Sequence, residues 1–217
     1  GKVSKVSQII TTNNFNDVDA VIGPLLSKNI EKAASTLQTQ NIPVFSPLSK
    51  VKLKEHSNLY QTLPSNELME NTMLNYITKH IDTINVIVIT GKEWTKRKGV
   101  IMAALPNARS IVPEKGNYLY VEDIQKQLDK TKENWVILDS DNPILVSNVV
   151  GLLNGIPHII LNEDGVEVGR NRLRLFAVNK SRAFDYDDVS NMHLANLNFT
   201  FPSANKHYDY EMMVPFL

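Results

Sequence analysis

Cysteine is missing from this chain of 217 residues. Its absence excludes disulfides, cysteine nucleophiles and thiolate metal sites, and it leaves the cellular compartment open. No apolar run reaches the roughly 18 residues that a membrane span requires, so we predict no transmembrane helix in this chain. Acidic and basic residues are equal in number, 23 of each, so general attraction to nucleic acid or to an anionic membrane is not expected.

The motifs of common enzyme and cofactor sites are also missing. The sequence contains no GxGxxG, no P-loop and no GxSxG motif. Its five histidines show no metal-ligand spacing with acidic residues. No pair of residues offers a nucleophile with its base, or two carboxylates in a known register. The sequence therefore predicts a protein without catalytic residues, metal site or cofactor.

The most informative stretch of the chain is residues 17–49. A short apolar run at 19–22 is stopped by Gly23-Pro24, and a helical pattern of apolar residues begins near Ser27. A second apolar run follows at 42–45. This order predicts two parallel strands joined by a right-handed crossover helix. Polar residues follow both strands, and open α/β sheets bind ligands at the carboxyl ends of their strands.

The rest of the chain repeats this alternation of strand and helix patterns. We expect further helices at residues 2–12, 66–77, 94–105, 121–128, 143–155 and 186–194. We expect further strands at 84–89, 109–112, 135–138, 157–161, 173–178 and 197–201, and an extended segment at 59–63 that passes between lobes. The β-branched run at 84–89 is typical of a parallel strand buried on both faces. These patterns predict an α/β protein with two sheets.

Three short motifs, in this order, carry a family resemblance. Residues 18–24 (VDAVIGP), 42–49 (IPVFSPLS) and 59–66 (LYQTLPSN) resemble the DVDAIIGP, IPVIS and FRTxPSD segments of the type I periplasmic binding proteins. That family contains the branched-chain amino acid binding proteins and receptor ligand-binding regions. Residues 173–203 look most like Bacteroidetes proteins that are amino-acid transporter binding proteins or carry peptidoglycan-binding LysM modules.

The resemblance implies two Rossmann-like lobes with parallel sheets, the first of them incomplete. Residues 1–60 would be part of the first lobe, 61–203 the second lobe, and 204–217 the start of a return segment to the first lobe. We therefore expect the chain to be a fragment of a longer protein. An incomplete lobe exposes apolar surface and an unpaired strand edge, so a homodimer through this lobe is one expectation.

The resemblance also implies a small-molecule ligand between the lobes. Backbone N–H groups and hydroxyls at helix starts would hold its carboxylate. The matching residues are Ser27, Ser46, Leu48, Ser49 and Lys50 in the first lobe, and Trp94, Ser140 and Asp141 in the second. Structural roles compete with these assignments: Ser27 and the residues near 140 as helix caps, Ser46 and Ser49 as turn residues, and Trp94 as a packing group.

Three functional hypotheses follow. The first is a non-catalytic module of the periplasm or cell envelope that captures a small polar solute, an amino acid or peptide-like molecule. The full-length protein could then carry a lipoprotein anchor. The second is a ligand-free scaffold of the same fold for envelope or peptidoglycan-synthesis proteins, favoured by Gln61 and Asn66 where the family has Arg and Asp. The third is a flavodoxin-like α/β enzyme. The basic residues near 92–98 predict a solvated helix face or a contact with an acidic partner.

Overall fold

The computed structural model describes residues 2–92, 95–114 and 116–204, without the side chains of residues 95 and 96. The described residues form two compact units. Unit 1 contains the residues up to Met69 together with Ser203 and Ala204, and unit 2 is Glu70–Pro202. No helix among the described residues combines the length and the apolar character that crossing a membrane would require.

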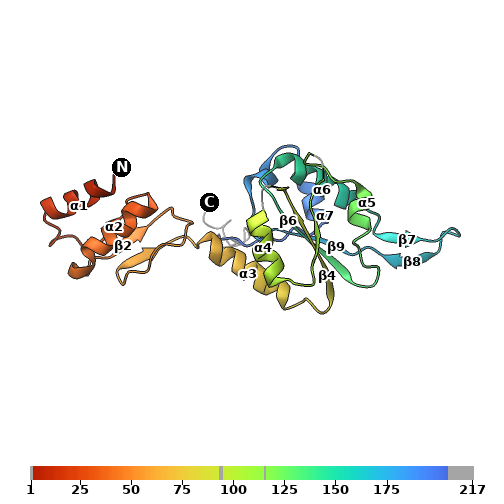
Figure 1. Cartoon of the computed structure of the whole chain (residues 1–217), viewed down its shortest axis with the longest axis horizontal. Helices are drawn as coiled ribbons and strands as arrows, with labels where there is room; N and C mark the ends of the chain where they lie inside the picture. Colours follow the sequence, from red (N-terminus) through yellow and green to blue (C-terminus); the bar gives the residue numbers. More distant parts are fainter. Residues whose placement is uncertain (1, 93–94, 115, 205–217) are drawn as a thin grey trace, which may run out of the picture. The chain divides into compact units, whose positions relative to one another are not determined.

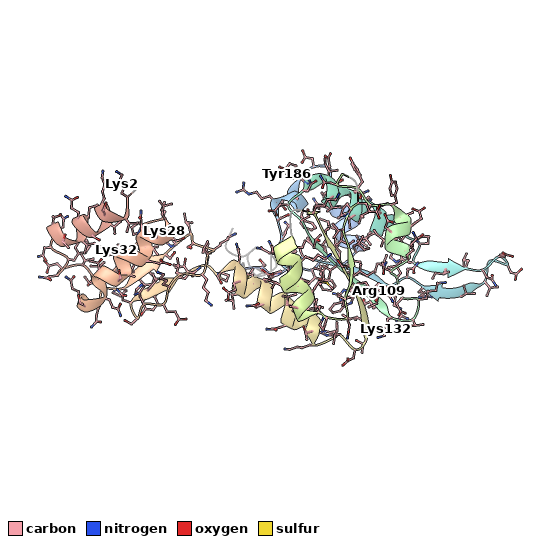
Figure 2. All side chains as sticks on the ribbon, in the orientation of Figure 1. Lys2, Lys28, Lys32, Arg109, Lys132 and Tyr186 are labelled. Atoms are coloured by element: carbon pink, nitrogen blue, oxygen red, sulfur yellow. The ribbon has the colours of Figure 1, made fainter. Side chains whose placement is uncertain are left out.

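Unit 1 is built around a small parallel sheet. Its elements are α1 (Val3–Thr12), β1 (Val21–Ile22), α2 (Ser27–Leu37), the 3-10 helix η1 (Gln38–Gln40), β2 (Val44–Ser46) and β3 (Leu59–Gln61). The strands pair in the order β1-β2-β3, all parallel. The buried face of α2 packs on Val44, while Lys28 and Lys32 lie on its exposed face (Figure 2). The predicted strand–helix–strand unit is confirmed.

The prediction for residues 59–63 was wrong in one respect. The segment was expected to pass between lobes, but Leu59–Gln61 forms the third strand of the first sheet. Pairing with β2 satisfies its backbone groups: the Val44 N–H donates to the Asn58 carbonyl at 2.7 Å, and the Thr62 N–H donates to the Ser46 carbonyl at 3.1 Å. A strand of three residues is too short for its apolar pattern to show, from the sequence alone, that it pairs with β2.

Unit 2 contains a larger parallel sheet with helices on both faces. Its elements are α3 (Asn66–Thr78, from Glu70 onward), β4 (Ile84–Thr90), α4 (Thr95–Ala104), β5 (Arg109–Ile111), α5 (Val121–Gln125), β6 (Glu133–Asp139), α6 (Pro143–Gly155), β7 (Ile159–Leu161), β8 (Glu167–Arg170), β9 (Leu173–Phe176), η3 (Arg182–Asp185) and α7 (Asn191–Asn196). Four strands pair in the order β5-β4-β6-β9, all parallel. The predicted α/β class with parallel sheets is confirmed.

Alternate residues of β4 and β6 divide the core of unit 2 into two halves. Val86 and Val88 of β4 pack with Ile137 of β6 and with apolar residues of α3 and α4. Ile87 and Ile89 pack on the opposite face with residues of α5, α6 and α7. Figure 1 shows α3 and α4 on one side of these strands and α6 and α7 on the other. Burial on both faces explains the continuous β-branched run at 84–89.

Three predicted elements of unit 2 differ from the structure. The strand expected at 157–161 lies outside the parallel sheet: β7 pairs antiparallel with β8 across the turn at residues 162–165. The strand expected at 197–201 is reduced to a single bridge between Phe176 and Thr200, after Asn198 with a positive φ of 47°. The helix expected from residue 186 begins only at Asn191, where the Ser190 side chain accepts a hydrogen bond from the His193 N–H.

The centre of the sheet generates a stability prediction. Ile137 is fully buried between β4 and β9, so Ile137→Ala should lower the free energy of unfolding by about 2–5 kcal/mol through lost burial and a cavity. Urea unfolding followed by circular dichroism measures this change. Val168→Ala, on the exposed β8, is the matched control and should change stability by less than about 0.5 kcal/mol. Equal effects of the two variants would contradict the observed packing.

Candidate functional site

A group of serine hydroxyls lies at the carboxyl end of the unit 1 sheet. Ser46 is the last residue of β2 and is fully buried, and its hydroxyl has no hydrogen-bond partner among the described residues. Ser46 lies on the same face of β2 as Val44, which packs against α2. The Oγ atoms of Ser27 and Ser49 lie 3.2 Å apart. We call Ser27, Ser46 and Ser49 the serine cluster.

No side chain caps the start of α2 among the described residues. The residue before the helix is Leu26, which supplies no side-chain cap, and the first turn contains no acidic residue. The alternative role of Ser27 as an N-cap is therefore wrong, since Ser27 is the first helical residue and its hydroxyl contacts Ser49. A helix start without a side-chain cap, at the positive end of the helix dipole, favours an anion.

The loop after β2 is held by a side chain from β3. The Gln61 side-chain amide donates to the backbone carbonyls of Ser49 at 2.8 Å and Val51 at 3.2 Å. Ser49 is buried by this arrangement, whereas Leu48 and Lys50 lie exposed on the same loop. Of the five predicted unit 1 residues, Ser27 and Ser49 thus lie in contact, Ser46 is buried at the end of β2, and Leu48 and Lys50 lie at the surface.

The predicted residues of unit 2 follow β6. Ser140 is buried, and its hydroxyl accepts the Asn142 N–H at 3.0 Å, while Asp141 is exposed. The cap of α6 is Asn142, whose side chain accepts from the N–H groups of Ile144 and Leu145. The capping role considered for the residues near 140 therefore belongs to Asn142. Trp94 lies outside the described residues.

A second polar group, which sequence reasoning did not assemble, lies at the carboxyl ends of β4 and β6. We call it the switch-point cluster: Glu70 of α3, Thr90 of β4, Arg97 of α4 and Asp139 of β6. Thr90 and Asp139 are paired residues of adjacent strands, so their side chains lie on the same face of the sheet. The chain leaves β4 toward β5 and leaves β6 toward β9, and such a reversal of strand order is where open α/β sheets bind ligands.

An ion pair lies at the centre of this cluster. Arg97 Nη2 is 3.0 Å from Asp139 Oδ1, and the Asp139 side chain is only 4% exposed. The interpretation of residues 92–98 as a solvated basic face is thus wrong for Arg97, whose side chain is 26% exposed. Burial raises the pKa of Asp139 from its ordinary 3.8 to about 6, against the lowering effect of Arg97 and with further raising by the charges of Glu70 and Asp141.

A weak signal for this cluster exists in the sequence. Each of the four polar residues lies on the same face of its helix or strand as the buried apolar residues, at the next position of the helical or strand repeat. Arg97 lies four residues before the buried Ile101, and Glu70 lies three before the buried Met73. Thr90 and Asp139 likewise follow the buried residues two positions earlier on their strands. Only the packing of all four elements shows that these polar ends meet.

The switch-point cluster is of mixed composition. Among the residues that the structure describes, no group of three or more His, Asp or Glu side chains could hold a metal ion. Its chemistry is that of two carboxyl groups, one hydroxyl and one guanidinium at the edge of an apolar core.

Comparisons with known proteins give only distant likenesses. No protein-family model matches the chain, and no curated protein matches it. A solved structure from Rhodospirillum rubrum, described as a branched-chain amino acid ABC transporter, is similar over 88% of this chain and 54% of its own, with 11% identity and a TM-score of 0.49. An ABC transporter substrate-binding protein from Desulfitobacterium hafniense is similar over 82% and 52%, with 17% identity and a TM-score of 0.38.

A third likeness is to an ABC transporter solute-binding protein from R. palustris in complex with benzoate, over 81% of this chain and 48% of that protein, with 12% identity and a TM-score of 0.33. The chain thus spans about half the length of each of these three structures. The predicted relation to Bacteroidetes and LysM proteins is not among these findings and stays a prediction.

The raised pKa of Asp139 generates a prediction about pH. Because the folded state binds this proton more tightly than the unfolded chain does, Asp139 should lower the free energy of unfolding by about 3 kcal/mol as pH rises from about 4 to about 6. Asp139→Asn does not titrate, so the stability of the natural protein relative to this variant should fall over the same window. Urea unfolding at a series of pH values measures the difference. Asp82→Asn, at the exposed amino end of β4, is the control, and a pH-independent difference for Asp139→Asn would contradict the assignment.

Proposed function

We propose that this chain is a non-catalytic ligand-binding module of the periplasm or cell envelope, and that it binds a small polar solute with a carboxylate group, an amino acid or a peptide-like molecule. The observation that carries the proposal is the Ser46 hydroxyl, which is fully buried and has no partner among the described residues. It lies on the face of β2 that packs on α2, a helix whose start is uncapped. A buried hydroxyl without a partner costs about 1–3 kcal/mol, and a bound carboxylate would accept its hydrogen bond.

Two further features support a carboxylate at this position. The Ser27 and Ser49 hydroxyls are 3.2 Å apart, so each can turn its proton toward a ligand oxygen instead. No acidic residue lies in the first turn of α2 to compete for the helix start. The exposed Lys50 adds a positive charge on the same loop, and Leu48 adds apolar surface for the rest of the solute. In unit 2 we propose Trp94, Ser140 and Asp141 as further contacts.

A specific observation favours the scaffold function as a second candidate. One face of the unit 1 sheet carries the paired residues Ile22, Phe45 and Tyr60 in a row across its three strands. Ile22 is 79% exposed and Tyr60 51% exposed, and the Phe45 and Tyr60 rings stack at 5.2 Å. Exposed apolar rows of this kind mark contacts with other proteins. An envelope protein or a second copy of the chain would fit this face.

A thermal-shift screen separates the two candidates. Amino acids and small peptides are added to the full-length protein, and a solute that binds only the folded state should stabilise it by about 2.7 kcal/mol at a concentration 100 times its Kd. The melting temperature should rise for a subset of the solutes. A flat response across the screen, with an envelope protein recovered by pull-down, would favour the scaffold.

The serine cluster generates the mutational prediction. The double variant Ser46→Ala, Ser49→Ala should weaken binding of the solute found in the screen by about 1–3 kcal/mol, because two hydroxyl donors to a charged group are lost. Isothermal titration calorimetry measures this loss. Ser35→Ala is the matched control, since Ser35 lies on the exposed face of α2 and its hydroxyl donates to the Lys32 carbonyl of the same helix. Unchanged affinity in the double variant would remove Ser46 and Ser49 from the site.

A further inference from the structure

The hairpin of β7 and β8 forms a two-stranded sheet of its own. Figure 1 shows it extending away from the helices and the parallel sheet of unit 2. Along it, the aliphatic side chains of Ile159, Leu161 and Val166 are between 47% and 58% exposed. A two-stranded hairpin is only marginally stable in water by itself, and further strands or a packed surface stabilise it. Exposed aliphatic side chains on such a hairpin therefore indicate a contact surface.

The hairpin ends in an acidic turn. Glu163 and Asp164 are neighbours in the turn at residues 162–165, and both are exposed. The Asn162 side chain closes this turn by accepting the N–H groups of Asp164 at 3.1 Å and Val166 at 2.8 Å. No lysine or arginine occurs from residue 159 to residue 169, so nothing within the strands offsets the two charges. We call Glu163 and Asp164 the acidic tip.

The other end of the hairpin is basic. A hollow of about 260 Å³ lies beside β8, and its lining includes four basic residues: Lys130, Lys132, Arg170 and Arg172. We call these four the basic root. Glu167 also lines the hollow, but its carboxylate is already paired with Arg170 at 2.6 Å. The adjacent Asp129 carboxylate accepts the backbone N–H groups of Thr131 and Lys132 at 2.8 and 3.0 Å. Four basic side chains against one lining carboxylate leave the hollow positively charged.

The acidic tip and the basic root are too far apart to neutralise each other within one copy. Arg172 follows Asp164 by eight positions, and a strand of this length spans roughly 20–25 Å. Charges at a protein surface are screened over about 8 Å at physiological ionic strength. The hairpin therefore carries two opposite charges at its ends that another molecule can pair.

A second copy of the hairpin, turned end for end, matches both ends at once. About a two-fold axis, the acidic tip of each copy lies at the basic root of the other, and the aliphatic middle parts lie side by side. The outer edges of β7 and β8 have no strand partner in the part of the chain that the structure describes, so backbone hydrogen bonds can add to this contact. Pairing in the same direction would bring like charges together, which is unfavourable.

We propose that two copies of this chain associate through their β7–β8 hairpins, which lie side by side and run in opposite directions. Two equivalent sets of charge pairs, each between an acidic tip and a basic root, hold the ends of the contact, and Leu161 and Val166 are buried between them. This surface belongs to unit 2, whereas the serine cluster and the exposed row of Ile22, Phe45 and Tyr60 belong to unit 1. The proposal therefore goes beyond solute binding and does not depend on it.

Charge reversal tests which ends meet. The tip variant carries Glu163→Lys and Asp164→Lys, and the root variant carries Lys130→Glu, Lys132→Glu and Arg172→Glu. Each alone should weaken self-association of the full-length protein by about 10- to 100-fold, because like charges then meet at both ends. An equimolar mixture of the two should associate again, since an altered tip then faces an altered root. Sedimentation velocity over a range of protein concentrations measures the mass of the associated species.

Two control variants show whether the hairpin itself is responsible. Asp187→Lys with Asp188→Lys makes the same charge change as the tip variant at exposed positions outside the hairpin, and it should leave self-association unchanged. Tyr60→Lys places a charge in the exposed row of unit 1 and should also leave it unchanged. An association that Tyr60→Lys abolishes and the tip variant tolerates would overturn the proposal, because the contact would then lie in unit 1.

Cysteine cross-linking reports the direction of pairing without reversing charges, and it serves even if the root variant does not fold. The natural chain contains no cysteine, so each introduced thiol is the only one in its copy. Asp164→Cys and Arg172→Cys, mixed in equal amounts under mild oxidation, should form a disulfide-linked dimer, and either variant alone should form much less. Equal cross-linking of Asp164→Cys with itself would show pairing in the same direction and overturn the proposal.

Two further outcomes would also overturn it. The first is a natural protein that stays monomeric up to about 1 mM, since a contact weaker than this has almost no net binding energy. The second is a monomer that binds an added poly-glutamate peptide and loses this binding in the root variant. The basic root would then serve an acidic partner protein instead of a second copy.

Discussion

The parallel pairing of β4 with β6 is the constraint on which unit 2 depends. Seven residue pairs run from Ile84–Glu133 to Thr90–Asp139, and nearly all of these residues are buried. A strand buried on both faces needs helices on both sides, and the two halves of the core provide them. A shift of this register by one residue would turn Asp139 into the opposite half of the core and separate it from Arg97. The same strand register thus fixes both the packing of the core and the position of Asp139 beside Arg97.

Asp139 and Thr90 are polar residues buried at the ends of apolar stripes, where they lose contact with water. An aspartate and a threonine buried beside isoleucine and valine lose hydration, and only partners in the protein or a ligand restore it. Arg97 restores part of it for Asp139, and the raised pKa shows that the compensation is incomplete. Natural sheets usually end such stripes in residues that water can reach. A partly satisfied buried group at a reversal of strand order is therefore typical of a site that recognises a ligand.

Unit 1 uses different chemistry at the equivalent edge of its sheet. β2 ends in the hydroxyl of Ser46 and β3 in the amide of Gln61, and the start of α2 provides the positive potential. Because no acidic residue lies there, an anion meets little competition at the helix start. The opposite face of the sheet exposes Ile22 and Tyr60. The two units thus differ in the charge of these sheet edges, which carry neutral hydroxyls in the serine cluster and two carboxyl groups with a guanidinium in the switch-point cluster.

The sequence alone determined the α/β class and most of the local elements, because hydrophobic periodicity depends on neighbouring residues: α2 and the buried β4 follow directly from it. It also marked Ser46 and Ser49 through a family resemblance to their loop. Only the tertiary structure decided that β3 joins the first sheet, that β7 turns back in a hairpin, and that Glu70, Thr90, Arg97 and Asp139 meet. Strand pairing and side-chain convergence join residues far apart in the chain, and a periodic pattern within one element carries no information about which other element will lie beside it.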